Sequence, residues 1–358
     1  MARQHYLPAT YLASFSSENI LPRRKRKIVQ GDKKTGKVAK GSAESFAHVK
    51  DLYTLLAPVT SGGSVRNPAL VDNIWSKYER DLATVIHRLI DRSLTAMEWA
   101  RTLVPFVTCL LIRHPEFTVR FNNRLIGLSD VVPADNVNTA RTIELQRLLG
   151  PVLAAEWIVS EVGGAGTLIT NDLGFAPFMT PISQGGLAIP IGHRYVLQVI
   201  PRRSRQIIEA KNGEWFPIIK YLLLKLDNHE GLNKALDGIA RRFIYGENER
   251  VVRQFLTTSG STPPLIPEPS AFGFISGRLA VVHEHTWYRL ISLLSKHPDS
   301  DQSYNFDIDF AAVAAGWAPV FWAATNLPQF RPALTRSGNI ISVEFFEVAG
   351  FTVKTRSE

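Results

Sequence analysis

The sequence predicts an α+β protein in which a mainly helical N-terminal half packs on a small, mostly antiparallel sheet. Apolar residues recur at spacings of three and four within residues 67–162 and again within 217–245, which is typical of amphipathic helices. Residues 165–210 between them hold short apolar runs separated by Gly and Pro, which is typical of short strands. Helices gathered against such a sheet form an α+β domain.

The first predicted elements are a short helix and a basic hairpin. Pro8 stands where a helix can begin, and apolar residues follow at helical spacing at Leu7, Tyr11, Leu12 and Phe15. Residues 27–30 then predict a strand, 32–36 a turn and 37–39 a return strand.

Three longer helices are predicted next. The first begins at Asn67-Pro68 and carries the apolar stripe Leu70, Ile74, Tyr78, Leu82, Val85 and Leu89. The second covers residues 95–113, with Pro105 as a candidate kink. The third runs from about 138 to 162 and ends at the glycine-rich residues 163–166. Strand candidates follow at 167–170, 187–190, 195–200 and 206–209, and a helix over 217–245 closes the sheet.

A proline-rich break at residues 261–269 is the best boundary in the chain. It predicts two domains, 1–260 and 270–358. The second is expected to be an α+β extension, helical at first, with strands around 340–346 and 351–354.

The composition narrows the class of protein. One cysteine among 358 residues excludes an internal disulfide, and residues 1–5 do not open an apolar signal segment. The longest uncharged run, 310–327, is rich in alanine, so it predicts buried helix and no membrane partner. We therefore expect a soluble, cytoplasmic protein.

The positive charge is concentrated in one segment. Residues 23–40 hold nine Lys or Arg and one Asp, which supplies almost all of the net charge of +9. Such an element predicts salt-sensitive binding of nucleic acid or another polyanion. The candidate anion-binding residues are Arg23, Arg24, Lys25, Arg26, Lys27, Lys33 and Lys34.

Glu79 lies on the apolar side of its predicted helix, close to Trp75 and Leu82. A carboxylate in such surroundings needs a partner or has a raised pKa. Arg113 ends an apolar run and is the predicted partner. We favour a structural ion pair between helices, and a functional carboxylate is the alternative, because perturbed carboxylates also mark active sites.

Two further polar positions leave alternatives open. His5 precedes Pro8, where it serves either as a general base or as a hydrogen-bonding group at the helix entry, and the structural role is favoured. Asp172, with Thr170 and Asn171, follows a predicted strand, where polar residues either face a cleft or form an ordinary turn.

Recognised catalytic and cofactor motifs are absent from the sequence. It has no Walker loop, dinucleotide fingerprint, nucleophile elbow or HExxH motif, so no cofactor is implied. His283-Glu284-His285 lacks a third ligand at zinc spacing, so no metal site is predicted. Cys109 lies among apolar residues and predicts a buried, inert thiol.

The opening residues QHYLPATYLASFS resemble a bacterial family known as domain of unknown function 4238. The matching residues are His5, Tyr6, Leu7, Pro8, Tyr11, Leu12 and Phe15. Later similarities follow in the family's order at 32–37, 50–53, Glu79, 113–115, 170–172, Asn233 and 240–245, so the resemblance covers about residues 1–255. Leu110 and Leu173-Gly174 depart from the family pattern of Gln and Asn-Pro.

The resemblance implies no activity, but it joins five polar residues in one framework. We hypothesise that His5, Glu79, Arg113, Asp172 and Asn233 converge on one pocket. The favoured function is a binding or regulatory protein whose basic hairpin holds an anion. The alternative is a nuclease-like effector, of the kind used in phage defence, with a His/Glu/Asp site. Whether the chain is an enzyme stays open.

Overall fold

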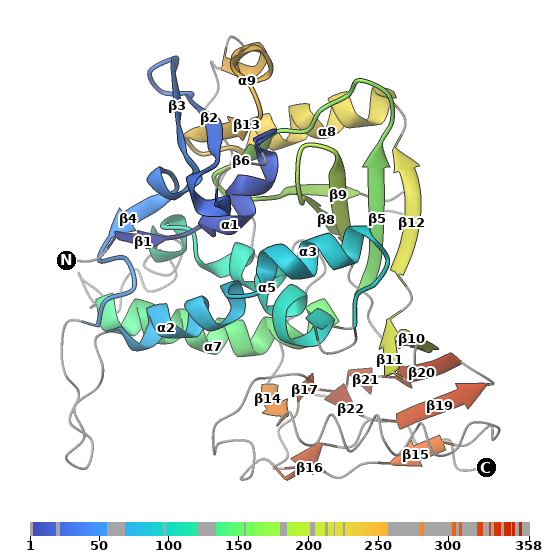
Figure 1. Cartoon of the computed structure of the whole chain (residues 1–358). Helices are drawn as coiled ribbons and strands as arrows, with labels where there is room; N and C mark the ends of the chain where they lie inside the picture. The colour runs from blue at the N-terminus through green and yellow to red at the C-terminus, as the bar shows by residue number, and fades with distance from the viewer. Residues whose placement is uncertain are drawn as a thin grey trace.

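The computed structural model describes most of residues 3–256 and short strands beyond them (Figure 1). The described ranges are 3–18, 22–55, 69–95, 98–119, 134–153, 155–179, 185–200, 205–211, 214–217, 219–224 and 226–256. Beyond these they are 279–282, 303–305, 308–309, 321–324, 329–330, 333–337, 340–344, 346–347 and 351–352. The structure contains both helices and mostly antiparallel sheets, which confirms the predicted α+β class.

The chain enters the fold as a strand and a short helix. β1 (Arg3–His5) pairs antiparallel with β4 (His48–Lys50). Helix α1 (Ala9–Leu12) begins directly after Pro8, as predicted, and the 3-10 turn η1 (Ala13–Phe15) continues it. The proline favours this start because its ring fixes φ near the helical value.

The basic segment forms the predicted hairpin. A 3-10 turn, η2 (Arg23–Lys25), leads into β2 (Lys27–Asp32), which pairs with β3 (Lys37–Ser42). The turn between them places Gly36 at a φ of +67°, where an L side chain would be strained. The 3-10 turn η3 (Ala43–Ser45) follows β3.

The hairpin is one side of a four-stranded sheet. β2 pairs with β13 (Phe243–Gly246), which also pairs with β6 (Thr170–Asn171), so the strand order is β3-β2-β13-β6. Helix α9 (Glu249–Leu256) lies against β2, β3 and β13 at the top of the molecule (Figure 1).

Replacing Gly31 with alanine is expected to lower the free energy of unfolding by about 1–3 kcal/mol, because the added methyl group would overpack the contact between β2 and α9. A Cβ atom there would lie 2.6 Å from Val252 and 3.0 Å from Leu256. Gly238, in helix α8 (Leu226–Ile239), has open space around its Cβ position, so Gly238→Ala is expected to stabilise the protein by up to about 1 kcal/mol. Urea unfolding compares both variants with wild type, and equal stability of Gly31→Ala would contradict this close packing.

A layer of helices lies beside this sheet. α2 (Leu70–Glu79) and α3 (Leu82–Ile90) occupy the span of the first predicted helix, with an interruption at Arg80-Asp81. The second predicted helix is a π-helical turn, η4 (Trp99–Leu103), followed by α5 (Val104–Ile112). Pro105 explains the change, because its nitrogen has no hydrogen to donate to the carbonyl of residue 101.

The third predicted helix is only partly correct. Helix α7 (Ala134–Leu153) ends early, and residues 156–162 form strand β5 (Glu156–Val162). Trp157, Ile158, Val159 and Ser160 are all buried in β5. Because the strand is covered on both faces, it lacks the alternation that distinguishes a strand from a buried helix.

β5 is an inner strand of a five-stranded sheet of order β12-β5-β9-β8-β7, in which β9 is central. β9 (Tyr195–Ile200) and β8 (Gly185–Pro190) were predicted, whereas β7 (Ala176–Met179) was missed. The sheet is mostly antiparallel, as expected, and β12 pairs with β5 in parallel. The ring of Trp99 in the π-helix meets that of Trp157 at 6.1 Å, which joins the helix layer to this sheet.

The predicted helix over 217–245 is also corrected. Only α8 (Leu226–Ile239) is helical, and it lies between strands β12 (Ile219–Leu224) and β13. The strand predicted at 167–170 is reduced to β6. Residues 206–209 lie in β10 (Arg205–Lys211), as predicted, and β11 (Glu214–Pro217) follows it.

The C-terminal region is described only as strands. β10 pairs with β20 (Ile340–Glu344), and the sheet continues to β19 (Ala333–Ser337) and β15 (Ser303–Asn305). This sheet crosses the predicted boundary between 1–260 and 270–358, and that division stays a prediction. The proline-rich break at 261–269 lies outside the described residues.

Smaller strand pairs complete the described part of this region. β14 (Leu279–Val282) pairs with β17 (Phe321–Ala324), so part of the run expected as helix is a strand. The other pairs are β16 (Ile308–Asp309) with β18 (Gln329–Phe330), and β21 (Phe346–Glu347) with β22 (Phe351–Thr352). Within the described ranges, no helix has the length and apolar character needed to cross a bilayer.

Candidate functional site

Arg113 is a buried cation at the end of α5, and it joins two of the other predicted site residues. Its side chain is 3% exposed. One guanidinium nitrogen donates to the Glu79 carboxylate at the end of α2, and another donates to the backbone carbonyl of His5 in β1. The predicted ion pair between helices is therefore confirmed.

The electrostatics of this pair favour the charged state of the arginine. Burial acts to lower the pKa of Arg113, but the negative charge of Glu79 holds that pKa above its ordinary value. The His5 ring is held separately, because its Nε2–H donates to the Glu44 carbonyl at 3.0 Å. Burial lowers the pKa of His5.

A second buried arginine, Arg141, which sequence reasoning missed, also lies close to Tyr53. The guanidinium carbons of Arg113 and Arg141 each lie 5.5 Å from the centre of the Tyr53 ring. Arg141 in α7 donates to the Ile112 carbonyl and to the side chains of Asn138 and Thr118. The spacing of Asn138 and Arg141 on one helical turn was the only available sequence signal.

Asp172 holds a turn of backbone together. Its two carboxylate oxygens accept hydrogen bonds from the backbone N–H groups of Arg241, Arg242 and Phe243, at 2.8, 2.7 and 3.1 Å. Burial raises the pKa of Asp172 to about 6, and these three donors limit the rise. The carboxylate thus positions the start of β13.

A pair of tyrosines lies near this carboxylate. The hydroxyls of Tyr6 and Tyr245 are hydrogen-bonded to each other, and burial raises the pKa of both, with a further contribution from the charge of Asp172. Tyr6 follows His5 directly in the chain, and its ring packs edge-on against His114 at 5.2 Å. This tyrosine therefore lies between the Asp172 turn and the Arg113 cluster.

Asn233 in α8 anchors the strand-like segment before β6. Its side chain accepts from the Ile169 N–H at 3.0 Å and donates to the Thr167 carbonyl at 2.9 Å. It also borders a cavity of about 700 Å³. The buried His229 lines the same cavity, and its Nδ1 has no hydrogen-bond partner in the described part of the chain.

The five predicted residues thus form three sets of contacts. His5, Glu79 and Arg113 come together, Asp172 holds the backbone at 241–243, and Asn233 holds the backbone at 167–169. Their convergence on one pocket stays a prediction. Each of these hydrogen bonds fixes backbone or another buried side chain, which is the chemistry of a structural polar network.

The seven candidate anion-binding residues differ in what they contact. Arg23 donates to the Ala83 carbonyl of α3 at 2.8 Å, and Lys33 forms an ion pair with Asp237 at 2.7 Å. Arg24, Lys25 and Lys27 are exposed. The remaining two candidates are the half-buried Arg26 and the exposed Lys34.

Two other predictions concern reactive side chains. Cys109 is buried, as predicted, and burial raises the pKa of its thiol to about 12. No group of three or more His, Cys, Asp or Glu side chains that could hold a metal ion occurs among the described residues. His283-Glu284-His285 lies outside them.

Comparison with known proteins finds a family model that matches the N-terminal part of the chain. Residues 3–130 match the family described as "Protein of unknown function (DUF4238)". The predicted resemblance is confirmed for this stretch, which includes His5, Glu79 and Arg113, and it stays a prediction from residue 131 to about 255. Neither a curated protein nor a solved structure matches the chain.

Proposed function

We propose that this chain, whose residues 3–130 match the family of unknown function DUF4238, is a binding protein that holds a polyanion against its basic hairpin. The observation that carries the proposal is a group of exposed cations in the hairpin and in the 3-10 turn that leads into it. Arg24, Lys25, Lys27, Lys34 and Lys37 are exposed and form no ion pair with any residue in the described ranges.

The attachment of the hairpin supports this function. Lys33 contacts Asp237 of α8, and Asp32 forms an ion pair with Arg242 at 2.9 Å. Residues 29–32 of β2 also pair with β13. Because these contacts order the hairpin in advance, binding an anion would cost little backbone entropy.

The cations of the basic segment have two different roles, which makes the sequence prediction more specific. Arg23 and Lys33 are engaged by backbone and carboxylate groups of the fold, so they serve mainly as anchors. The exposed lysines and Arg24 are the groups that can contact phosphate groups. Counterion release from a polyanion would supply much of the affinity, which makes binding strongly salt-dependent.

The nuclease-like alternative receives less support. Both oxygens of Asp172 accept backbone hydrogen bonds, and Glu79 is bound to Arg113. Neither carboxylate is presented to a substrate in this arrangement. A binding or regulatory protein is therefore the function that the contacts favour.

Replacing Lys25 and Lys27 together with alanine is expected to weaken binding to a short duplex DNA and to make it less salt-sensitive. Loss of two phosphate contacts lowers the slope of log K against log salt by about 2. Fluorescence anisotropy of a labelled duplex, between about 50 and 200 mM salt, measures both quantities.

The matched control removes two positive charges from a different surface. Lys220 lies in β12, and Arg194 directly precedes β9 of the same sheet. The double alanine variant of these residues should keep the wild-type slope. Equal slopes for both double variants, or no binding of duplex DNA or heparin by the wild type, would contradict a hairpin site.

A further inference from the structure

A polar cavity lies between α8, the start of α9 and residues 165–167, and none of the hairpin cations lines it. Its volume is about 700 Å³, within the usual range for small-molecule sites. Figure 1 shows the chain that leads from β5 to β6 running beside α8, and Asn233 of α8 holds that chain in place by two hydrogen bonds.

Each of the two helices brings one charge of each sign to this cavity. Glu230 and Lys234 come from α8, and Glu247 and Arg250 come from the start of α9 and the residues just before it. Glu230 and Lys234 are four residues apart, a spacing that commonly produces an ion pair on a helix. Nevertheless, none of the four charged groups forms an ion pair with a residue in the described part of the chain.

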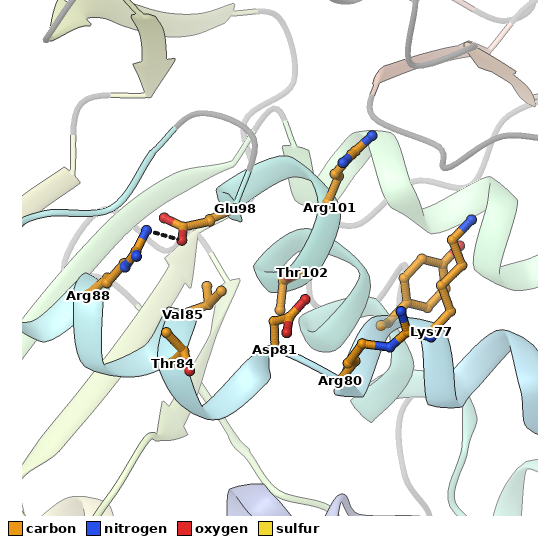
Figure 2. Close-up of a pocket in the computed structure, with 10 residues that line it drawn as sticks. Lys77, Arg80, Asp81, Thr84, Val85, Arg88, Glu98, Arg101 and Thr102 are labelled. Carbon is orange, nitrogen blue, oxygen red and sulfur yellow. Dashed lines mark hydrogen bonds and ion pairs between the residues drawn. The ribbon is translucent and has the colours of Figure 1, made fainter.

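Another cavity, of about 510 Å³ between α3 and η4, contrasts with this arrangement. Figure 2 shows Arg88 and Glu98 bonded to each other in that cavity. Glu98 also accepts hydrogen bonds from the backbone and the hydroxyl of Thr95. This carboxylate is therefore engaged by the fold, whereas the four charged groups between α8 and α9 are available to a ligand.

The wall between α8 and residues 165–167 contains a buried imidazole. His229 is 7% exposed, and its Nδ1 has no hydrogen-bond partner within the described ranges. Its ring lies directly against Gly166, where a Cβ atom would be 2.8 Å from Cε1 and 3.0 Å from Nδ1 of His229. Buried polar groups are nearly always hydrogen-bonded, so a nitrogen without a partner in the wall of a cavity points to a bound molecule.

Helix α9 adds an apolar part to the same wall. Val251 and Phe255 line the cavity, are half-buried and pack against the hydrophobic core. This part of the wall is therefore held firmly and can accept an aliphatic group of a ligand.

We propose that this cavity binds a small zwitterion, namely an α-amino acid or a short peptide with an aliphatic side chain. Glu230 and Glu247 bind its ammonium group. Lys234 and Arg250 bind its carboxylate, and His229 supplies a further hydrogen bond. A compound with only one sign of charge would instead face two like charges without a partner for them. The proposal goes beyond the hairpin and does not depend on it.

The test is isothermal titration calorimetry of the full chain with L-leucine, and separately with the dipeptide L-leucyl-L-leucine, at about 150 mM salt, which screens distant charges. N-acetyl-L-leucine lacks the ammonium group, and L-leucinamide lacks the carboxylate. Wild type is expected to bind both of these at least about 10-fold more weakly than L-leucine, because one set of charge-assisted hydrogen bonds is lost. Tighter binding of L-leucine identifies a free amino acid as the ligand class, and tighter binding of the dipeptide identifies a peptide.

Two double variants are expected to change which compound binds. Glu230→Gln/Glu247→Gln leaves two cations, so it should bind N-acetyl-L-leucine more tightly than wild type does. Lys234→Gln/Arg250→Gln leaves two carboxylates, so it should bind L-leucinamide more tightly than wild type does. Misfolding of a variant cannot produce either gain.

Two controls remove positive charge from other surfaces. Arg88→Gln changes the cavity between α3 and η4, Lys25→Ala/Lys27→Ala changes the hairpin, and both should bind L-leucine like wild type. The proposal is overturned if neither L-leucine nor the dipeptide binds at millimolar concentration. It is also overturned if N-acetyl-L-leucine or L-leucinamide binds wild type as tightly as L-leucine, or if neither double variant gains affinity.

Discussion

Replacing Arg113 with methionine is expected to lower the free energy of unfolding by about 3–5 kcal/mol, the largest effect of any single substitution considered. The variant leaves the Glu79 carboxylate, whose side chain is 21% exposed, without its cation. It also removes the donor that meets the His5 carbonyl. Urea unfolding of the full chain, followed by circular dichroism, measures the loss.

Two further variants distinguish the stability contributed by the buried Arg113–Glu79 ion pair from that of an exposed ion pair. Adding Glu79→Leu to Arg113→Met should recover part of the loss, because no uncompensated carboxylate then remains. Arg88→Met breaks an exposed pair with Glu98 and should cost less than about 1 kcal/mol. If Arg113→Met costs no more than Arg88→Met, the buried pair is not what holds β1 to the helices.

The second large effect is a pH dependence that arises from Asp172. Burial raises its pKa from the ordinary value of 3.8 to about 6 in the folded protein. Between these two pH values the folded state therefore binds more protons than the unfolded state does. The stability that Asp172 contributes is fully present below pH 3.8 and is lost as the pH rises through 6. The loss is about 3 kcal/mol by pH 7. It is measured as the difference between wild type and Asp172→Asn in urea unfolding from pH 4 to 7.

Asp32 provides a control of opposite sign. Burial acts to raise the pKa of Asp32, but hydrogen bonds from Arg242 and the Lys34 N–H lower it below the ordinary value. The stability that Asp32 contributes is present above the pKa it has in the unfolded state. It is lost as the pH falls through the pKa that Asp32 has in the folded state. If the difference between wild type and Asp172→Asn grows with rising pH, the three backbone donors outweigh burial at Asp172.

Local patterns predicted the elements whose side chains have one buried face. The stripe from Leu70 to Leu89 predicted α2 and α3, and the turn at 32–36 between two short strand-like runs predicted β2 and β3. The pattern failed where both faces are buried, as in β5. It also failed at β12, whose parallel pairing with β5 depends on a distant segment.

The sequence predicted the candidate site only where a single residue was chemically unusual in its local surroundings. Glu79 was identified because a carboxylate on an apolar face needs a partner, and Arg113 was that partner. Asp172 was identified as a strand-end residue, but its role depends on backbone atoms at 241–243, which no local pattern reveals. Arg141 was missed because two of its partners, Ile112 and Thr118, lie in other segments of the chain.

The strand order β3-β2-β13-β6 has a consequence for how the chain is made. Asp32 in β2 pairs with Phe243 in β13, so the hairpin leaves the ribosome long before its partner strand exists. At typical synthesis rates, the delay is roughly 10 to 40 s. During that interval β2 has an open edge beside the apolar Ile28 and Val29, and lysines near such an edge discourage pairing with other chains. The same cations that suit the hairpin to an anion would then also protect the nascent protein from aggregation.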